Sequence, residues 1–145
     1  MRSPPHFPVL RVNSTHVQRV DVRRFAKENA FYIDRGVYGP GTFLIDSLGI
    51  RHDVMRCELV RRSWNLLDLI DKHPWFYVRL ELGQQKPLTL ENAKGILEKL
   101  ISEKRWYRQS HESKGEFLAW FDKIASFSEL VASISLYGGW CGRNK

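Results

Sequence analysis

The clearest pattern in the chain is an alternation of apolar and polar positions that gives way to a helical repeat. Between residues 75 and 82, every second side chain is apolar; this face holds Phe76, Val78, Leu80 and Leu82. A period of two predicts a β-strand with one buried face. We expect Gly83 and Pro87 to end this strand.

A capped amphipathic helix is predicted directly afterwards. Thr89 is a suitable N-cap residue. The apolar residues then recur with a 3.6-residue period at Leu90, Ala93, Ile96, Leu97, Leu100 and Ile101. The strand and this helix are expected to pack together as the centre of the fold.

Two more amphipathic helices are predicted in the last third of the chain. The first carries an apolar stripe of Phe117, Leu118, Phe121, Ile124 and Ala125. The second opens with a capping box between Ser126 and Glu129. Its stripe continues through Phe127, Leu130, Val131 and Ile134.

The first third of the chain is richer in strand signals. Val9 to Val12 predicts a short strand, whereas residues 17–33 fit either an alternating strand or a helix capped by Asp21. We favour a helix from about Val22. Glycines at positions 36, 39 and 41 then predict a connecting loop without the spacing of a phosphate-binding loop.

A hairpin is predicted around the turn Ser47-Leu48-Gly49, with strands at 42–46 and 53–61. The side chains expected to face inward are Phe43, Ile45, Met55, Cys57 and Leu59. After the hairpin, Ser63 can start a short helix that carries Trp64, Leu67 and Ile70. This helix should end before His73, because Pro74 disfavours the α conformation in its predecessor.

Strands followed by helices, without regular βαβ alternation, predict an α+β fold. We expect a small, mainly antiparallel sheet of about three to five strands, packed against the C-terminal amphipathic helices. The 145 residues (1–145) fit one domain. Residues 1–8, with three prolines, predict an extended, loosely held lead-in, and residues 138–145 a flexible tail.

Composition narrows the function only slightly. The net charge of +7 and the pI near 9.6 favour anionic partners, but the basic residues are spread evenly over the two halves of the chain. Arginines cluster locally at Arg23-Arg24, at Arg61-Arg62, and at Lys104-Arg105 with Arg108. The two cysteines, the lack of a signal-peptide pattern and the absence of any long apolar run favour a cytoplasmic protein that does not bind membranes.

The residues that most often carry out catalysis form no recognisable constellation here, so we assign no catalytic, metal or cofactor-binding residue. His16 would meet Asp21 and Asp34 only if the N-terminal region folded them together, and His52 is expected in a solvated turn. Cys57 alternates with buried positions and is interpreted as a small hydrophobic residue. Two carboxylates, Glu58 and Glu81, are expected to form cross-strand ion pairs with Arg79 and Arg56.

The best candidate for an interaction patch is Arg105, Trp106, Tyr107 and Arg108, with Trp120 as a second exposed aromatic residue. Arginine and large aromatic residues are enriched where binding partners are anchored. The alternative interpretation is that Trp106 and Tyr107 close the core while the arginines solvate the helix end.

The segment Phe43-Leu44-Ile45-Asp46-Ser47-Leu48-Gly49, the strand Val78-Arg79-Leu80-Glu81-Leu82 and the helix opening Ser126-Phe127-Ser128-Glu129 resemble small bacterial immunity-type and mobile-element α+β proteins. The resemblance covers about two-thirds of the chain. It implies a protein without cofactor that works by binding another protein.

Three hypotheses follow from the sequence. The leading one is a non-catalytic, inhibitor-like protein of bacterial or phage type that binds another protein or forms a homodimer through its sheet face or edge. The second is a nucleic-acid-binding protein that uses arginines for phosphates and Trp106 or Tyr107 for base stacking. The third is a small hydrolase-type enzyme dependent on a histidine or a metal.

Overall fold

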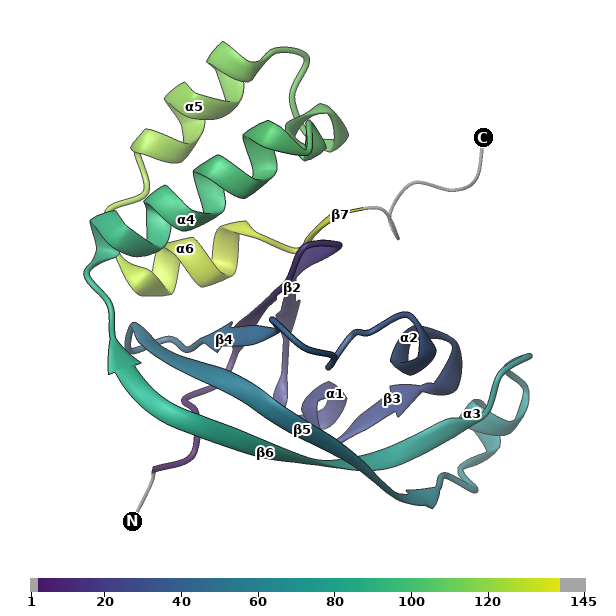
Figure 1. Ribbon diagram of the computed structural model, residues 1–145. Helices are drawn as coiled ribbons and strands as arrows, with labels where there is room; N and C mark the ends of the chain where they lie inside the picture. Colours follow the sequence, from purple (N-terminus) through teal and green to yellow (C-terminus); the bar gives the residue numbers. More distant parts are fainter. Residues whose placement is uncertain (1–2, 139–145) are drawn as a thin grey trace.

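The computed structural model describes residues 3–138, which form one antiparallel sheet with helices on both of its faces (Figure 1). The seven strands are β1 (Val9–Val12), β2 (His16–Val20), β3 (Lys27–Asn29), β4 (Phe43–Ile45), β5 (Ile50–Arg62), β6 (Trp75–Pro87) and β7 (Leu136–Gly138), in the spatial order β3-β6-β5-β4-β1-β2-β7. The sheet curls into a half-barrel, and its inner, concave face holds short helices (Figure 1).

The helices fall into two groups. Two short ones, α1 (Val22–Phe25) and α2 (Ala30–Asp34), lie within the curl of the sheet, while α3 (Leu66–Leu69) joins β5 to β6. The C-terminal group contains α4 (Leu90–Glu103), the 3₁₀ turn η1 (Trp106–Gln109), α5 (Lys114–Asp122) and α6 (Phe127–Ser133). None of the described helices is long and apolar enough to span a membrane.

The prediction of about three to five strands is wrong, although the fold is α+β. The sheet has seven strands because β3 and β7, of three residues each, add to its two ends. The sequence Lys27-Glu28-Asn29 has no apolar alternation, and Leu136-Tyr137-Gly138 is too short to show a period. Pairing with longer neighbours, rather than intrinsic preference, makes these segments strands.

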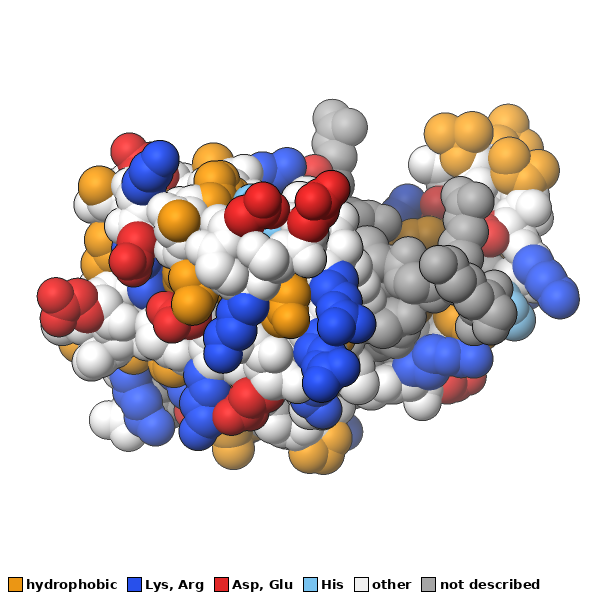
Figure 2. Space-filling model, turned by 90° about the horizontal axis from the view of Figure 1, so that it is seen from above, with side chains coloured by type: hydrophobic (Ala, Val, Ile, Leu, Met, Phe, Trp, Pro, Cys, Tyr) orange, Lys and Arg blue, Asp and Glu red, His pale blue; other side chains and the backbone are white. Residues whose placement is uncertain are grey.

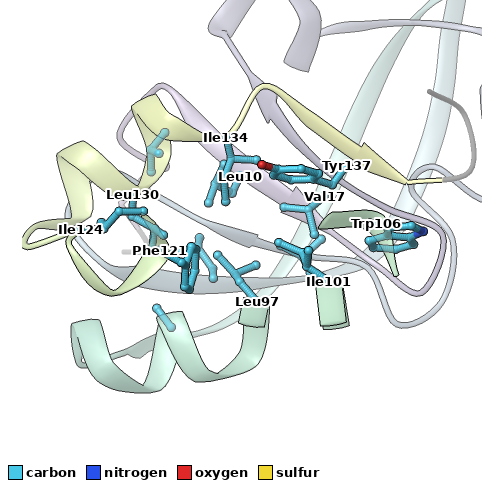
Figure 3. Packing of buried hydrophobic residues seen from close by; sticks show 14 of the residues in the cluster. Leu10, Val17, Leu97, Ile101, Trp106, Phe121, Ile124, Leu130, Ile134 and Tyr137 are labelled. Atoms are coloured by element: carbon cyan, nitrogen blue, oxygen red, sulfur yellow. The ribbon is translucent and has the colours of Figure 1, made fainter. Parts of the chain in front are cut away.

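The C-terminal helices cover the outer face of β1, β2 and β4 through a large apolar core (Figure 3). The predicted stripes supply this core: Leu97 and Ile101 from α4, Phe117 and Phe121 from α5, and Leu130 from α6 are completely buried. The predicted caps are also present. The Thr89 side chain accepts a hydrogen bond from the Asn92 amide, and the Ser126 side chain accepts one from that of Glu129.

A second, smaller core fills the concave face. Its buried members are Val9, Val20, Val37, Tyr38, Leu44 and Val54. Side chains from α1 and α2, among them Phe25 and Ile33, pack against it. The expected loop around the glycines at positions 36, 39 and 41 therefore contributes to the interior, because Val37 and Tyr38 are buried in the smaller core.

Between residues 16 and 34 both competing interpretations hold in part. A strand forms at His16–Val20, and a helix begins at Val22 as we favoured, but it lasts only one turn before β3. The short segments arise because this part of the chain runs from one end of the sheet to the other.

Three strand details differ from the predictions. The second hairpin strand begins at Ile50, and Met55 and Leu59 are 66% and 49% exposed instead of facing inward. Irregularities in the β5–β6 pairing at His52/Val54, Val54/Arg56 and Leu59/Arg61 shift the alternation, so Val54 points inward in their place. Gly83 does not end β6, which continues to Pro87, and the Met55 side chain lies next to the space that a Cβ at Gly83 would occupy.

The two ends of the chain also depart from expectation. Residues 3–8 have no regular structure, yet hydrogen bonds to Asp46, Ser47 and Gln85 hold them against the sheet. Gly138, assigned to a flexible tail, pairs with His16 as part of β7. The rest of the predicted tail, residues 139–145, lies outside the described part of the chain.

We expect Leu97→Ala to lower the free energy of unfolding by about 3 kcal/mol, because it leaves a cavity in the larger core. Lys99→Ala, an exposed change on the same helix, should shift it by less than about 0.5 kcal/mol. Urea denaturation of both variants measures the difference. Equal effects would contradict the assignment of Leu97 to the core.

Candidate docking surface and buried polar network

Five exposed apolar side chains lie together where β5 and β6 are joined. We call this group the apolar tip; it consists of Trp64, Leu66, Leu67, Leu69 and Ile70. Leu66 and Ile70 are each 81% exposed, Leu67 is 76% exposed and Trp64 68%. Hydrophobic side chains gather at this extremity of the molecule in Figure 2, where Figure 1 places α3.

The sequence predicts a helix here, and the structure has one, but its apolar stripe faces solvent. The cap is Asn65 rather than Ser63, and the helix spans Leu66–Leu69. One turn is too short to cover a core, and the β5–β6 pairing holds it away from the two apolar clusters. The missed tip residues are Leu66 and Leu69. The run Leu66-Leu67-Asp68-Leu69-Ile70 could have indicated them, because it places apolar side chains on more than one face of a helix, and a single buried face cannot hold them all.

The tip is held from below by polar contacts with β3 and within the segments on either side of α3. The Asp68 carboxylate accepts hydrogen bonds from Lys27 Nζ at 2.6 Å and from Ser63 Oγ. Burial alone would raise the pKa of Asp68, but these hydrogen bonds and the lysine charge outweigh it and hold the pKa below its usual value. The Ala30 amide donates to the Pro74 carbonyl at 2.8 Å. The apolar side chains are therefore displayed on an ordered support.

The aromatic side chains of the interaction patch predicted from sequence are mostly covered by the rest of the protein. Trp106 is only 8% exposed, and Tyr107 and Trp120 are half-buried against the larger core. The Tyr107 ring stacks on that of Phe117 with centroids 6.3 Å apart. Only Arg105 and Arg108 are exposed. The alternative interpretation of these rings as core residues fits this placement, and a binding role for the arginines stays a prediction.

A buried polar network crosses the concave side of the sheet and centres on Arg11. Its guanidinium donates to Glu28 Oε2 at 3.0 Å, to His16 Nε2 at 3.1 Å and to Gln18 Oε1 at 2.6 Å. The same group lies 4.8 Å from the centre of the Tyr38 ring. Arg11, His16 and Glu28 are each at most 5% exposed. The Arg11–Glu28 ion pair thus joins β1 to β3 through the interior.

The location of His16 argues against the active site considered from the sequence. Asp21 and Asp34 are exposed, whereas the His16 ring is buried. Because Arg11 donates to Nε2, the proton of the neutral ring lies on Nδ1, which faces Thr15 Oγ1 at 3.1 Å. Burial, reinforced by the Arg11 charge, lowers the pKa of His16 to about 3. The ring is thus a neutral structural acceptor.

His52 is not in a solvated turn as expected, because the turn ends before it and places it in β5. Its side chain is 1% exposed, and Nε2 lies 3.1 Å from Asp46 Oδ2. Asp46 also accepts hydrogen bonds from the amides of His6, Leu48 and Ile50. Burial would raise the pKa of Asp46, but these hydrogen bonds outweigh it and lower the pKa. The pair fastens the turn and the lead-in together.

The remaining candidate groups have structural roles. Cys57 is half-buried, and burial, followed by the Glu28 charge, raises the pKa of its thiol, which opposes thiolate formation. One of the two expected cross-strand ion pairs is present, between Glu58 and Arg79 at 3.7 Å. Arg56 stands opposite Glu81 in the sheet, but in the described part of the chain their side chains form no ion pair. Within residues 3–138, no three His, Cys, Asp or Glu side chains are grouped as a metal site.

We expect Glu28→Gln to lower the free energy of unfolding by about 3 kcal/mol, because Arg11 then stays buried without a counter-charge. Glu58→Gln removes the exposed partner of Arg79 and should cost less than about 1 kcal/mol. Chemical denaturation at neutral pH compares the two variants. Similar small losses would show that the buried pair does not hold the sheet.

The low pKa of His16 predicts a loss of stability in mild acid. Well above pH 6.5 the ring is neutral in both the folded and the unfolded chain. Between pH 6.5 and about 3, His16 is protonated in the unfolded chain but stays neutral in the folded protein. At pH 5 this lowers the free energy of unfolding by about 2 kcal/mol.

Denaturation at several pH values between 7 and 4 tests this slope. His16→Gln should flatten it, whereas His6→Gln, which changes an exposed ring, should leave it unchanged. A slope that survives His16→Gln would assign the acid sensitivity to other groups.

Comparisons of the chain with protein families, with curated proteins and with solved structures found no match. The candidate site therefore rests on the geometry described above.

Proposed function

We propose that this chain is a non-catalytic, inhibitor-like binding protein that works by docking its apolar tip onto another protein. The observation that supports this proposal is the exposure of Leu66, Leu67 and Ile70, each at least 76% accessible at one extremity. Burying such a side chain stabilises a structure by about 1.5–3 kcal/mol relative to leaving it in water, and in the free protein these three side chains do not provide that stabilisation. A contiguous exposed apolar group marks an interaction surface.

The support under the tip adds to the argument. Lys27, Ser63 and Asp68 fix the helix through hydrogen bonds, so little conformational freedom is lost when a partner binds. Trp64 is the kind of large aromatic side chain that often dominates the energy of an interface. Ordered apolar side chains with a tryptophan are well suited to fill a preformed socket.

A carboxylate just after the helix favours a protein over a lipid surface. Asp71 is exposed directly after Ile70, and its carboxylate accepts a hydrogen bond from Trp75 Nε1 at 2.8 Å. Inserting Ile70 into a bilayer would carry this carboxylate toward the apolar phase, and removing a charged group from water is costly. A protein surface can present a donor to it instead.

The buried titratable groups support a role without catalysis. His16 and His52, at 0% and 1% exposure, are shielded from any substrate, and both are hydrogen-bonded to neighbouring side chains of the fold. The chain uses these groups to hold its own loops and strands.

Replacing Leu67 and Ile70 with serine should abolish partner binding without reducing stability, because both side chains are exposed in the free protein. A tagged chain purified from host cells, followed by quantitative mass spectrometry, measures the partner. We expect recovery to fall about tenfold or more for this double variant. The matched control is Val22→Ser with Leu48→Ser, which changes two side chains exposed to 60% and 61% elsewhere.

Unfolding measurements should show that both double variants keep the parental stability within about 1 kcal/mol. Equal recovery of the same proteins by the tip variant, the control variant and the parent would refute docking through the tip.

A further inference from the structure

Two arginines flank the apolar tip with their charges held in place. Arg61 and Arg62 end β5 and are exposed. The Arg61 guanidinium lies 4.2 Å from the centre of the Tyr77 ring, and that of Arg62 lies 4.9 Å from the Trp64 ring. Stacking on a ring orients the planar guanidinium while its edges remain available for hydrogen bonds.

The carboxylates near the tip are already engaged with other groups. Asp68 is bound by Lys27 and Ser63, and Asp71 by the indole of Trp75. Among residues 3–138, no carboxylate lies within 4.0 Å of the Arg61 or Arg62 guanidinium. Both cations therefore lack a counter-ion in the described part of the protein.

Charge decides between the possible occupants of the tip. A second copy that docked tip to tip would bring its own Arg61 and Arg62 toward those of the first copy, and like charges facing one another oppose association. A carboxylate, in contrast, matches the fork of a stacked guanidinium and accepts two hydrogen bonds from it. The complement of the tip is thus acidic as well as apolar.

We infer that the partner is a protein whose docking site combines an apolar socket for Leu66, Leu67 and Ile70 with carboxylates that face Arg61 and Arg62. This inference rests on the docking role proposed above and specifies the chemistry of the same surface. The apolar contacts supply most of the binding energy, and the arginine–carboxylate contacts select the partner and its orientation.

The first experiment finds the partner by contact. A photo-crosslinking amino acid replaces Leu69, which is 41% exposed at the margin of the tip, in the full chain expressed in its host. Mass spectrometry then identifies the crosslinked peptide. We expect a peptide from another protein that contains or adjoins acidic residues. Crosslinks only to a second copy of this chain or only to lipid would overturn the inference, and no crosslink at all would count against docking itself.

The second experiment measures affinity for the crosslinked protein in purified form. Arg61→Glu with Arg62→Glu should raise the dissociation constant about tenfold or more. Arg61→Lys with Arg62→Lys should raise it about threefold, because lysine keeps the charge but cannot form the two parallel hydrogen bonds of a stacked guanidinium. The matched control is Lys99→Glu with Lys114→Glu, which makes the same change in net charge at exposed positions of α4 and α5. It should change the affinity less than about twofold.

The outcomes separate the two proposals. If the Leu67→Ser, Ile70→Ser variant loses binding while the Arg61 and Arg62 charge reversals do not, the tip docks but its partner is not selected by carboxylates. If neither variant changes the affinity, docking through the tip fails as well. If the Lys99 and Lys114 control weakens binding equally, net charge alone explains the effect and the inference is overturned.

Discussion

The curl of the sheet depends on one buried ion pair, between Arg11 and Glu28. Three strands, β4, β5 and β6, separate β1 from β3, so these side chains meet only when the sheet bends until its concave sides approach. A buried guanidinium without a counter-charge would cost several kcal/mol, and the ion pair forms only in the bent sheet. His16 and Gln18 take further hydrogen bonds of Arg11, and Tyr38 lies beneath its face. Curvature and charge neutralisation therefore require each other.

The same short strand links the interior to the apolar tip. Along β3, Glu28 points inward to Arg11, whereas its neighbour Lys27 reaches out to Asp68 of α3. Asn29, the next residue, caps α2 and donates to the His73 carbonyl at 3.2 Å. Three consecutive polar residues thus hold the curled sheet, the support of the tip and the start of a helix. This concentration of contacts explains why a segment without an apolar pattern is structurally important.

Local patterns predicted the elements whose stability is mostly local. The periodicity of α4 and α5, the caps Thr89 and Ser126 and the alternation of β6 are visible in the sequence, because each depends on residues at most a few positions apart. The strand number and the register of β5 are not visible, since β3 and β7 become strands only through pairing and irregularities in β5 move Val54 inward. The sequence predicts a helix at the tip, and an apolar stripe on a helix is ordinarily assumed to be buried, but here the stripe is exposed. Only the complete fold shows that no core lies within reach of Leu67.

Two central strands serve as a common wall for both cores. In β4, Leu44 belongs to the concave cluster and its neighbour Ile45 to the larger one, and in β1 the same division separates Val9 from Leu10. Neither side of this wall can loosen without exposing buried side chains on the other. The body of the protein should consequently melt as one cooperative unit. Its amide hydrogens along β1 and β4 should exchange with solvent only through global unfolding.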